Sequence, residues 1–334
     1  MKRCEILSSL FILIFIGACN EVDQTHEQSG KLLFTRLTSE ETNVSFVNKI
    51  EDREDFNIFK YRNFYNGGGV AIGDINNDGL PDIYFTANME KNRLYLNKGD
   101  FTFEDITDKA GVGGNKPWST GVVMADVNGD GFLDIYVSNA GNMEGNNHDN
   151  DLYINNGDLT FTERAAEFNL AKSGFSTHAS FFDYDKDGDL DVYLLNNSNI
   201  PVSSLGYAAD RDKRASDWES VPERFRGVGD VLLRNDNGKF VDVSEQAGIY
   251  GSLIGFGLGV MVCDINGDTY PDIYISNDFY ERDYLYINQQ DGTFKEQIKD
   301  WTSHLCLSAM GVDIADINND GLQDIFITDM MPEE

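Results

Sequence analysis

The 334-residue sequence predicts an all-β protein, a β-propeller of four-stranded antiparallel blades. Three observations indicate this fold: an acidic nine-residue segment occurs five times, a dense apolar segment follows each copy, and a hairpin-like segment follows the first four. Repeated four-stranded units of about 40 to 60 residues are typical of propeller blades. We therefore expect four complete blades and a partial fifth, which the chain leaves unfinished at Glu334, as a truncated reading frame would.

The acidic segments are spaced by 52, 57, 81 and 52 residues. They are DINNDGLPD from Asp74, DVNGDGFLD from Asp126, DYDKDGDLD from Asp183, DINGDTYPD from Asp264 and DINNDGLQD from Asp316. Each copy follows small and apolar residues and precedes a continuous apolar run such as DIYFT, which predicts a strand buried on both faces. Each acidic segment is thus expected to connect the first and second strands of its blade.

The third and fourth strands of each blade are predicted from segments such as LYLNKGDFTF, whose Asn, Gly and Asp residues favour a hairpin turn. The long third spacing indicates a polar insertion, residues 196–229, between the second and third strands of the third blade. Because antiparallel strands alternate in direction, this insertion and the acidic loops are expected at opposite ends of the blades.

Residues 34–44, FTRLTSEETNV, have the pattern of residues 103–112, FEDITDKAGV, the predicted outer strand of the first blade. Two interpretations stay open. The segment either supplies the outer strand of the last blade or forms a stray edge strand.

Each acidic loop carries Asp or Asn at positions 1, 3, 5 and 9, and position 7 adds a backbone carbonyl. Five or more hard oxygen ligands on a flexible loop suit Ca²⁺ better than the strict octahedron of Mg²⁺. The sequence therefore predicts a Ca²⁺ cofactor in each loop. The predicted ligands are Asp74, Asn76, Asp78, Leu80 and Asp82; Asp126, Asn128, Asp130, Phe132 and Asp134; Asp183, Asp185, Asp187, Asp189 and Asp191; Asp264, Asn266, Asp268, Tyr270 and Asp272; and Asp316, Asn318, Asp320, Leu322 and Asp324.

Position 6 is glycine in four loops, as a left-handed turn around an ion requires. The fourth loop has Thr269 there, where a β-branched residue makes that conformation costly, so it fits the pattern least well. An EF-hand would need a glutamate at position 12, which is apolar in all five copies. The competing interpretation is a set of ordinary Asn/Asp turns, but 17 carboxylates in five short loops would repel one another without cations.

The net charge of −31 argues against nucleic acid and against adsorption to anionic lipid, because both would be repelled. Four cysteines do not form a disulfide framework: Cys4 lies in the leader, Cys19 at its end, and Cys263 and Cys306 either pair or remain buried thiols.

Residues 1–18 predict a secretory signal, with Lys2 and Arg3 before an apolar run that is too short to span a bilayer. The sequence IGAC at its end resembles the lipobox of bacterial lipoproteins. The resemblance implies acylation of Cys19, a flexible tether over residues 19–30, and a lipid-anchored place in the envelope of a Gram-negative, Bacteroidetes-like bacterium, at the outer membrane or cell surface. An ordinary signal peptide is the alternative.

From residue 31 to 334 the repeat D-x-N-x-D-G-x-x-D, followed by D-I-Y and N-x-G-D-x-x-F, resembles FG-GAP/VCBS repeats. Such repeats occur in the integrin α-subunit propeller and in ASPIC/UnbV-type relatives of cartilage acidic protein. The resemblance implies calcium-binding loops on a propeller.

The sequence contains no recognisable nucleophile motif or paired histidines. It predicts a non-enzymatic, calcium-binding propeller that binds extracellular protein or glycan through the loops opposite the acidic ones. Trp118 and Trp218 either belong to that surface or hold long loops in place. Whether His178 points toward the central channel stays open, and we expect it to have a structural role. Two alternatives remain: a calcium-dependent lyase or hydrolase acting on polysaccharide, and a scaffold domain of a larger surface protein.

Overall fold

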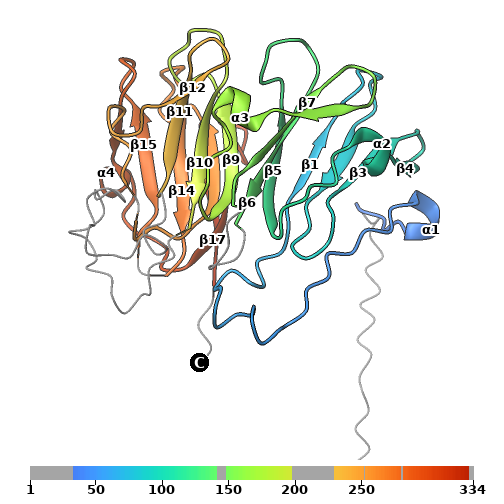
Figure 1. The fold of residues 1–334 in the computed structure, drawn as a ribbon. Helices are drawn as coiled ribbons and strands as arrows, with labels where there is room; N and C mark the ends of the chain where they lie inside the picture. The colour runs from blue at the N-terminus through green and yellow to red at the C-terminus, as the bar shows by residue number, and fades with distance from the viewer. Residues whose placement is uncertain (1–32, 141–147, 198–228, 252, 280, 331–334) are drawn as a thin grey trace, which may run out of the picture. The chain divides into compact units, whose positions relative to one another are not determined.

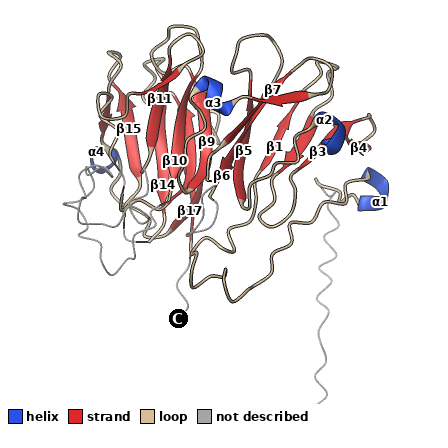
Figure 2. Cartoon of the chain, viewed as in Figure 1, coloured by secondary structure: helices blue, strands red, loops and turns tan. Residues whose placement is uncertain are grey.

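The computed structural model describes residues 33–140, 148–197, 229–251, 253–279 and 281–330. The described residues from Thr38 onward form one compact unit, and Leu33–Leu37 belong to a second. Within the larger unit, the described residues form four four-stranded antiparallel sheets and one two-stranded sheet (Figures 1 and 2). The predicted all-β fold of propeller blades is confirmed.

The first two sheets follow one another along the chain. They contain β1 Val70–Gly73, β2 Asp82–Phe85, β3 Arg93–Asn97 and β4 Phe103–Asp105, then β5 Ser119–Ala125, β6 Asp134–Asn139, β7 Asp151–Asn155 and β8 Phe161–Glu163. Strands within each sheet are neighbours in sequence order, so every sheet is a simple meander.

The later sheets repeat this plan. They contain β9 Ser176–Phe182, β10 Asp191–Asn196, β11 Val231–Asn235 and β12 Phe240–Asp242, then β13 Gly257–Cys263, β14 Asp272–Asn277, β15 Tyr284–Asn288 and β16 Phe294–Glu296, and finally β17 Ala309–Ala315 and β18 Asp324–Asp329. The short helices α2 Thr107–Ala110, α3 Ala165–Phe168 and α4 Ile298–Trp301 follow the outer strands β4, β8 and β16, and α1 Ser39–Thr42 precedes the first sheet. The predicted insertion falls between β10 and β11, and its residues 198–228 lie outside the described part of the chain.

The first strand of each sheet contacts the first strand of the next, in the order β1, β5, β9, β13 and β17. Hydroxyl groups join these inner strands: Thr120 donates to the Ser176 carbonyl at 2.6 Å, and Thr177 donates to the Gly257 carbonyl at 2.9 Å. Glycine permits the close approach, since a Cβ at Gly69 would lie 2.8 Å from the Thr120 carbonyl oxygen. The small residues before each acidic loop therefore serve packing between blades.

The hydrophobic core lies between neighbouring sheets. The second strands β6, β10 and β14 are buried along their whole length, as the apolar runs predicted. One core cluster joins Tyr84 of the first sheet to Val137 of the second, and another joins Tyr136 of the second to Leu194 of the third. The second, third and fourth sheets thus each bury one face against the previous sheet and the other against the next.

Residues 33–48 contain no strand, so neither interpretation of residues 34–44 as a strand is met in this structure. What the segment shares with residues 103–112 is the helical turn: α1 ends at left-handed Asn43 as α2 ends at left-handed Gly111. Among the described residues, no helix is both long and apolar enough to cross a membrane.

Candidate functional site

The five acidic segments all form the loops between first and second strands, as predicted, and all 25 expected ligand residues are described. Position 6 is left-handed in each loop, including Thr269 at φ 75°. Position 4 is left-handed as well, at Asn77, Gly129, Lys186, Gly267 and Asn319. Sequence reasoning missed position 4, although Asn and Gly, which tolerate this conformation, occupy four of its five copies.

The aspartate at position 1 organises the tip of each loop. Asp74 accepts hydrogen bonds from the backbone N–H groups of Asp78, at 3.1 Å, and Gly79, at 2.7 Å. The other four loops repeat this pair of bonds with Asp126, Asp183, Asp264 and Asp316. These bonds turn the chain around its own carboxylates, so the acidic side chains of one loop share a small volume.

In the four complete blades, the aspartate at position 9 is buried and joins the loop to the blade by hydrogen bonds. In the third sheet, Asp191 accepts from the backbone N–H of Tyr184 at 3.1 Å and of Asn235 at 2.8 Å. Asp82, Asp134 and Asp272 make the same two bonds in their sheets. This carboxylate therefore has a structural function in addition to its predicted role as a ligand.

The third-strand asparagines connect neighbouring loops. Asn155 donates through Nδ2 to the Ile75 carbonyl of the preceding blade at 2.8 Å. Asn288 donates in the same way to the Tyr184 carbonyl at 2.9 Å. The loops thus form a connected layer at one end of the sheets.

The third loop offers the clearest test of whether a cation fits. Single oxygen atoms of Asp183, Asp185 and Asp187 all lie within 4.8 Å of one another. Within this loop, Asp185 Oδ1 and Asp189 Oδ1 are buried and have no hydrogen-bond partner. Buried carboxylate oxygens without donors are rare and costly, and a hard divalent cation is the partner that such a cluster suits. The loop's residues therefore fit Ca²⁺.

Burial raises the pKa of several of these aspartates, and neighbouring carboxylates raise it further. The pKa of Asp134 rises to about 6, that of Asp189 to about 6 and that of Asp191 to about 7. The same two causes raise the pKa of Asp82, and burial raises that of Asp272 with Asp268 adding to it. A bound cation would lower the pKa of these aspartates again, because it favours the ionised form of each ligand.

The fourth loop closes like the others despite Thr269. Its N–H donates to Asp264 at 2.7 Å, as the glycine N–H does elsewhere. Lys186 of the third loop supports it: its ammonium donates to the Thr269 hydroxyl at 2.8 Å and lies 4.1 Å from the Tyr270 ring centroid. A neighbouring loop therefore contacts the strained position.

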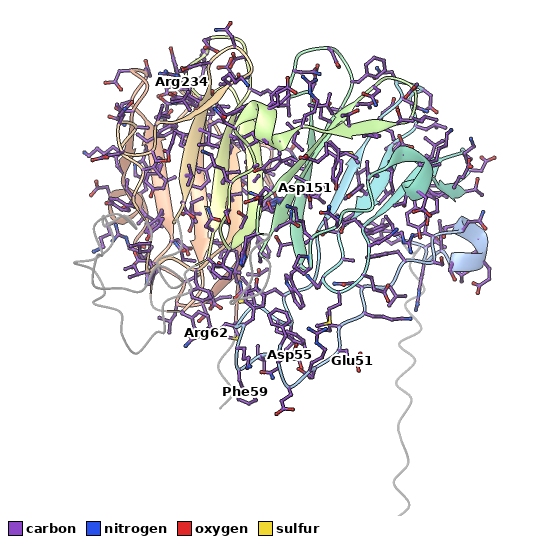
Figure 3. All side chains as sticks on the ribbon, in the orientation of Figure 1. Glu51, Asp55, Phe59, Arg62, Asp151 and Arg234 are labelled. Carbon is purple, nitrogen blue, oxygen red and sulfur yellow. The ribbon has the colours of Figure 1, made fainter. Side chains whose placement is uncertain are left out.

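The opposite end of the sheets is covered by residues 50–69, here called the cap segment. Figure 3 shows Arg234, beside the acidic loops, at one end of the sheets, and Phe59 and Arg62 of the cap segment at the other. Phe56, Tyr61 and Phe64 of this segment form a buried aromatic cluster with Trp118 and Phe175, which precede β5 and β9. Trp118, only 1% exposed, thus pins this region rather than facing a partner.

A cavity of about 560 Å³ lies beneath the cap segment, against the starts of the inner strands. His178, whose orientation the sequence left open, is one of the residues that line it. Burial lowers the pKa of His178, so the imidazole is neutral near pH 7. Cys263 and Cys306, whose pairing the sequence left open, are free thiols. Trp218 of the predicted insertion lies outside the described residues.

The comparisons agree with the repeat analysis. An FG-GAP-like repeat matches residues 74–137, 140–194 and 264–327, more than half of the chain. Cartilage acidic protein 1 from Xenopus tropicalis is 32% identical over 217 residues, covering 64% of this chain and 29% of that protein. The Homo sapiens protein is 30% identical over 217 residues, covering 64% and 28%. The chain spans less than a third of the length of these relatives.

Among solved structures, an Agrocybe aegerita lectin that recognises non-reducing terminal N-acetylglucosamine covers 76% of this chain and 58% of its own. Its sequence identity of 18% and TM-score of 0.40 are too low to support a conclusion. The repeat matches, in contrast, contain the acidic loops and the buried strands described above. The chain belongs to the family of proteins built from FG-GAP-like repeats, with cartilage acidic protein 1 among its relatives.

Proposed function

We propose that this protein is a calcium-loaded, non-enzymatic propeller that binds extracellular protein or glycan through the end opposite its acidic loops. The observation that carries the calcium assignment is the pair of buried, unpartnered carboxylate oxygens of Asp185 and Asp189. The acidic loops lie at one end of the blades and would bind Ca²⁺ there. The cap segment and the neighbouring connections, at the other end, are then available to bind a partner.

Binding is favoured over catalysis by the chemistry of the cavity. Among the described residues that line it, none is Asp, Glu, Lys or Arg. Polysaccharide lyases and hydrolases need an acid and a base at the reacting bond. The titratable side chains in the described lining are His178, Tyr61 and Tyr65, so the pair of carboxylates that a typical glycoside hydrolase uses is not found there.

The calcium proposal predicts that chelation lowers the melting temperature and that Ca²⁺ restores it better than Mg²⁺. Each site occupied at about 100 times its Kd stabilises the fold by about 2.7 kcal/mol, so several sites give a shift of many degrees. Calorimetry of the purified protein, dialysed against chelator and then reloaded with either ion, measures this. Identical melts in all three states would contradict it.

The recognition proposal is tested by screening the calcium-loaded protein on arrays of extracellular proteins and glycans, with product analysis for cleaved glycan. Deleting residues 199–227 from the insertion, joined by a short Gly/Ser linker, is expected to weaken binding while the melting temperature stays unchanged. The matched variant Asn76→Ala, in an acidic loop, is expected to leave partner binding intact at saturating Ca²⁺. Detection of new reducing ends or unsaturated sugars would contradict the non-enzymatic function, because it would show that the protein cleaves glycan.

The anchor is a further part of the proposal. Cys19→Ser is expected to abolish acylation and to move the protein from the membrane fraction to the soluble fraction, since the lipid supplies its only proposed attachment. Metabolic labelling with an alkyne fatty acid, followed by fractionation, checks both. Membrane association that survives Cys19→Ser would require a different tether.

A further inference from the structure

The third and fourth acidic loops contact each other and share one backbone conformation, but different groups surround their carboxylates. Position 6 is left-handed in both, at Gly188 with φ 98° and at Thr269 with φ 75°. In both loops the N–H of this residue donates to the aspartate at position 1. A difference in calcium affinity between the two loops would therefore come from their side chains rather than from the path of the chain.

The ammonium group of Lys186 lies against the fourth loop, although the residue belongs to the third. Its Nζ donates to the Thr269 hydroxyl at 2.8 Å and lies 4.1 Å from the Tyr270 ring centroid. These two residues come directly after Asp268, the predicted ligand at position 5. A neighbouring blade thus offsets part of the negative charge of this loop, and a divalent cation that enters the loop meets a like charge.

Position 4 is the residue through which one loop contacts the next. In the first loop, Asn77 Nδ2 donates at 3.0 Å to the carbonyl of Gly131, which is position 6 of the second loop. This contact is the neutral counterpart of the bond from Lys186 to Thr269. The remaining loops have Gly129, Gly267 and Asn319 at position 4. The fourth loop is therefore the one that receives a positive charge from position 4 of its neighbour.

A second donor reaches the fourth loop from the hairpin between β15 and β16. Gln290 Nε2 donates to Asp268 Oδ2 at 3.0 Å, and Asn266 Nδ2 donates to the same oxygen at 2.9 Å. The first two sheets have Gly99 and Gly157 at the matching place, where the N–H again donates to the last asparagine of the third strand. Glycine has no side chain, so the first and second loops lack this donor.

The third loop presents the opposite case. Its predicted ligands include five aspartates, whereas those of the fourth loop include three. Asp185 Oδ1 and Asp189 Oδ1 are buried without a hydrogen-bond partner. Carboxylate oxygens without donors gain most from a cation, and oxygens that already accept hydrogen bonds gain less. Since ligand charge sets the calcium affinity of acidic loops over several orders of magnitude, the two loops should differ measurably.

We propose that Lys186 and Gln290 lower the calcium affinity of the fourth loop, so that it loses its ion before the third loop when the Ca²⁺ concentration falls. This rests on the proposed function, in that the acidic loops bind Ca²⁺, and it adds an order of occupation and the residues that set it. Neither residue is a ligand. Each acts on the site from outside, Lys186 by its charge and Gln290 by its hydrogen bond to a ligand.

The test titrates the chelated, full-length protein with Tb³⁺, whose emission is sensitised by nearby tyrosine, and then displaces Tb³⁺ with Ca²⁺. The third loop contains Tyr184 and the fourth contains Tyr270, and the other three acidic loops contain no tyrosine. We expect two phases of sensitised emission with different calcium affinities. Asp187→Ala should remove the tighter phase, and Asp268→Ala, at the same position of the fourth loop, should remove the weaker one.

Two variants test the residues that set the order. Lys186→Met should raise the calcium affinity of the weaker phase about fivefold, because it removes a like charge close to a divalent ion at an exposed site. The tighter phase should change less, since the ammonium group lies against the fourth loop. Gln290→Gly, which restores the residue of the first two hairpins, should raise the affinity of the weaker phase about threefold, the effect of one hydrogen bond.

The matched controls separate charge from packing. Lys186→Arg keeps the charge and should leave the affinity of the weaker phase unchanged. Lys109→Met, at an exposed position of α2 in the first sheet, changes the net charge equally and should also leave it unchanged. The difference between the original protein and Lys186→Met should shrink as salt is added, because salt screens exposed charges.

Three results would overturn this inference: a fourth loop that binds Ca²⁺ as tightly as the third; Lys186→Met and Gln290→Gly that both leave the weaker phase unchanged; or Lys186→Arg that acts like Lys186→Met. Each of them would leave the calcium part of the proposed function standing, because both loops would still bind the ion. A protein that gives no sensitised emission at all would overturn the calcium assignment and this inference with it.

Discussion

At the scale of single residues, the aspartate at position 9 shows how one side chain serves both fold and site. Its two oxygens accept backbone N–H groups from the loop and from the end of the third strand, in all four complete blades. The aspartates at the loop tip, such as Asp183 and Asp187, also accept backbone N–H groups, but only from their own loop. Structural and ligand contributions can be separated by mutation.

We predict that Asp191→Asn destabilises the protein both with and without Ca²⁺, because the new amide N–H₂ would face a backbone N–H donor. Leaving that donor unpaired costs about 1 to 3 kcal/mol. The matched variant Asp187→Asn, at the exposed loop tip, should lose stability only when Ca²⁺ is present. Urea unfolding of both variants with and without Ca²⁺ measures the difference, and equal behaviour of the two would refute the structural role.

At the scale of the loop, the fourth copy keeps the common conformation at the cost of strain. Thr269 has φ 75°, where an L-residue costs about 1 to 2 kcal/mol, and Gly188 holds the same position in the third loop at φ 98°. A Cβ at Gly188 would meet no atom within 4 Å, so only backbone strain distinguishes the two sites. Exchanging the residues at these two positions therefore tests whether Thr269 is strained.

Thr269→Gly is expected to stabilise the protein by about 0.5 kcal/mol or more, the strain relieved less the added entropy of the unfolded glycine. Gly188→Thr should destabilise it by a similar amount. The hydrogen bond that Lys186 gives to Thr269 is exposed and worth little, which Lys186→Met would verify. Thermal unfolding of the three variants decides; a loss of stability in Thr269→Gly would show that the threonine is not strained.

The loops also show what the sequence could and could not predict. The local hydrophobic period and composition were sufficient to predict the strands of the blades, the order of the blades and the turn at Gly79. Each of these depends on residues that are close in the chain. The bond from Asn155 to the Ile75 carbonyl joins residues of different blades, and no local pattern indicates it. The burial of Trp118 and the cavity wall at Tyr61 likewise depend on a cap segment whose path over the sheets is a long-range property.

At the scale of the whole molecule, the excess of negative charge couples stability to both pH and cations. The raised pKa values of Asp134, Asp189 and Asp191 mean that the folded, ion-free protein binds protons more tightly than the unfolded chain, whose aspartates titrate near 3.9. Stability without cations therefore falls as pH rises from about 4 to 7, which is opposite to the usual trend for ion-paired carboxylates. Bound Ca²⁺ keeps these three aspartates ionised, so they no longer contribute to the change of stability with pH.

We predict that the melting temperature of the chelated protein declines from pH 5 to pH 7.5 and that saturating Ca²⁺ flattens this decline. Part of the slope should survive, because burial also raises the pKa of Asp151 and Asp283 to about 6, and neither belongs to an acidic loop. Asp283→Asn is the matched control: it should reduce the slope equally with and without Ca²⁺, whereas Asp134→Asn should reduce it only in the chelated protein. Calorimetry across this pH range distinguishes the two. Parallel pH profiles with and without Ca²⁺ would mean that the cation does not bind at the buried aspartates, and the pH dependence would then belong to the blades alone.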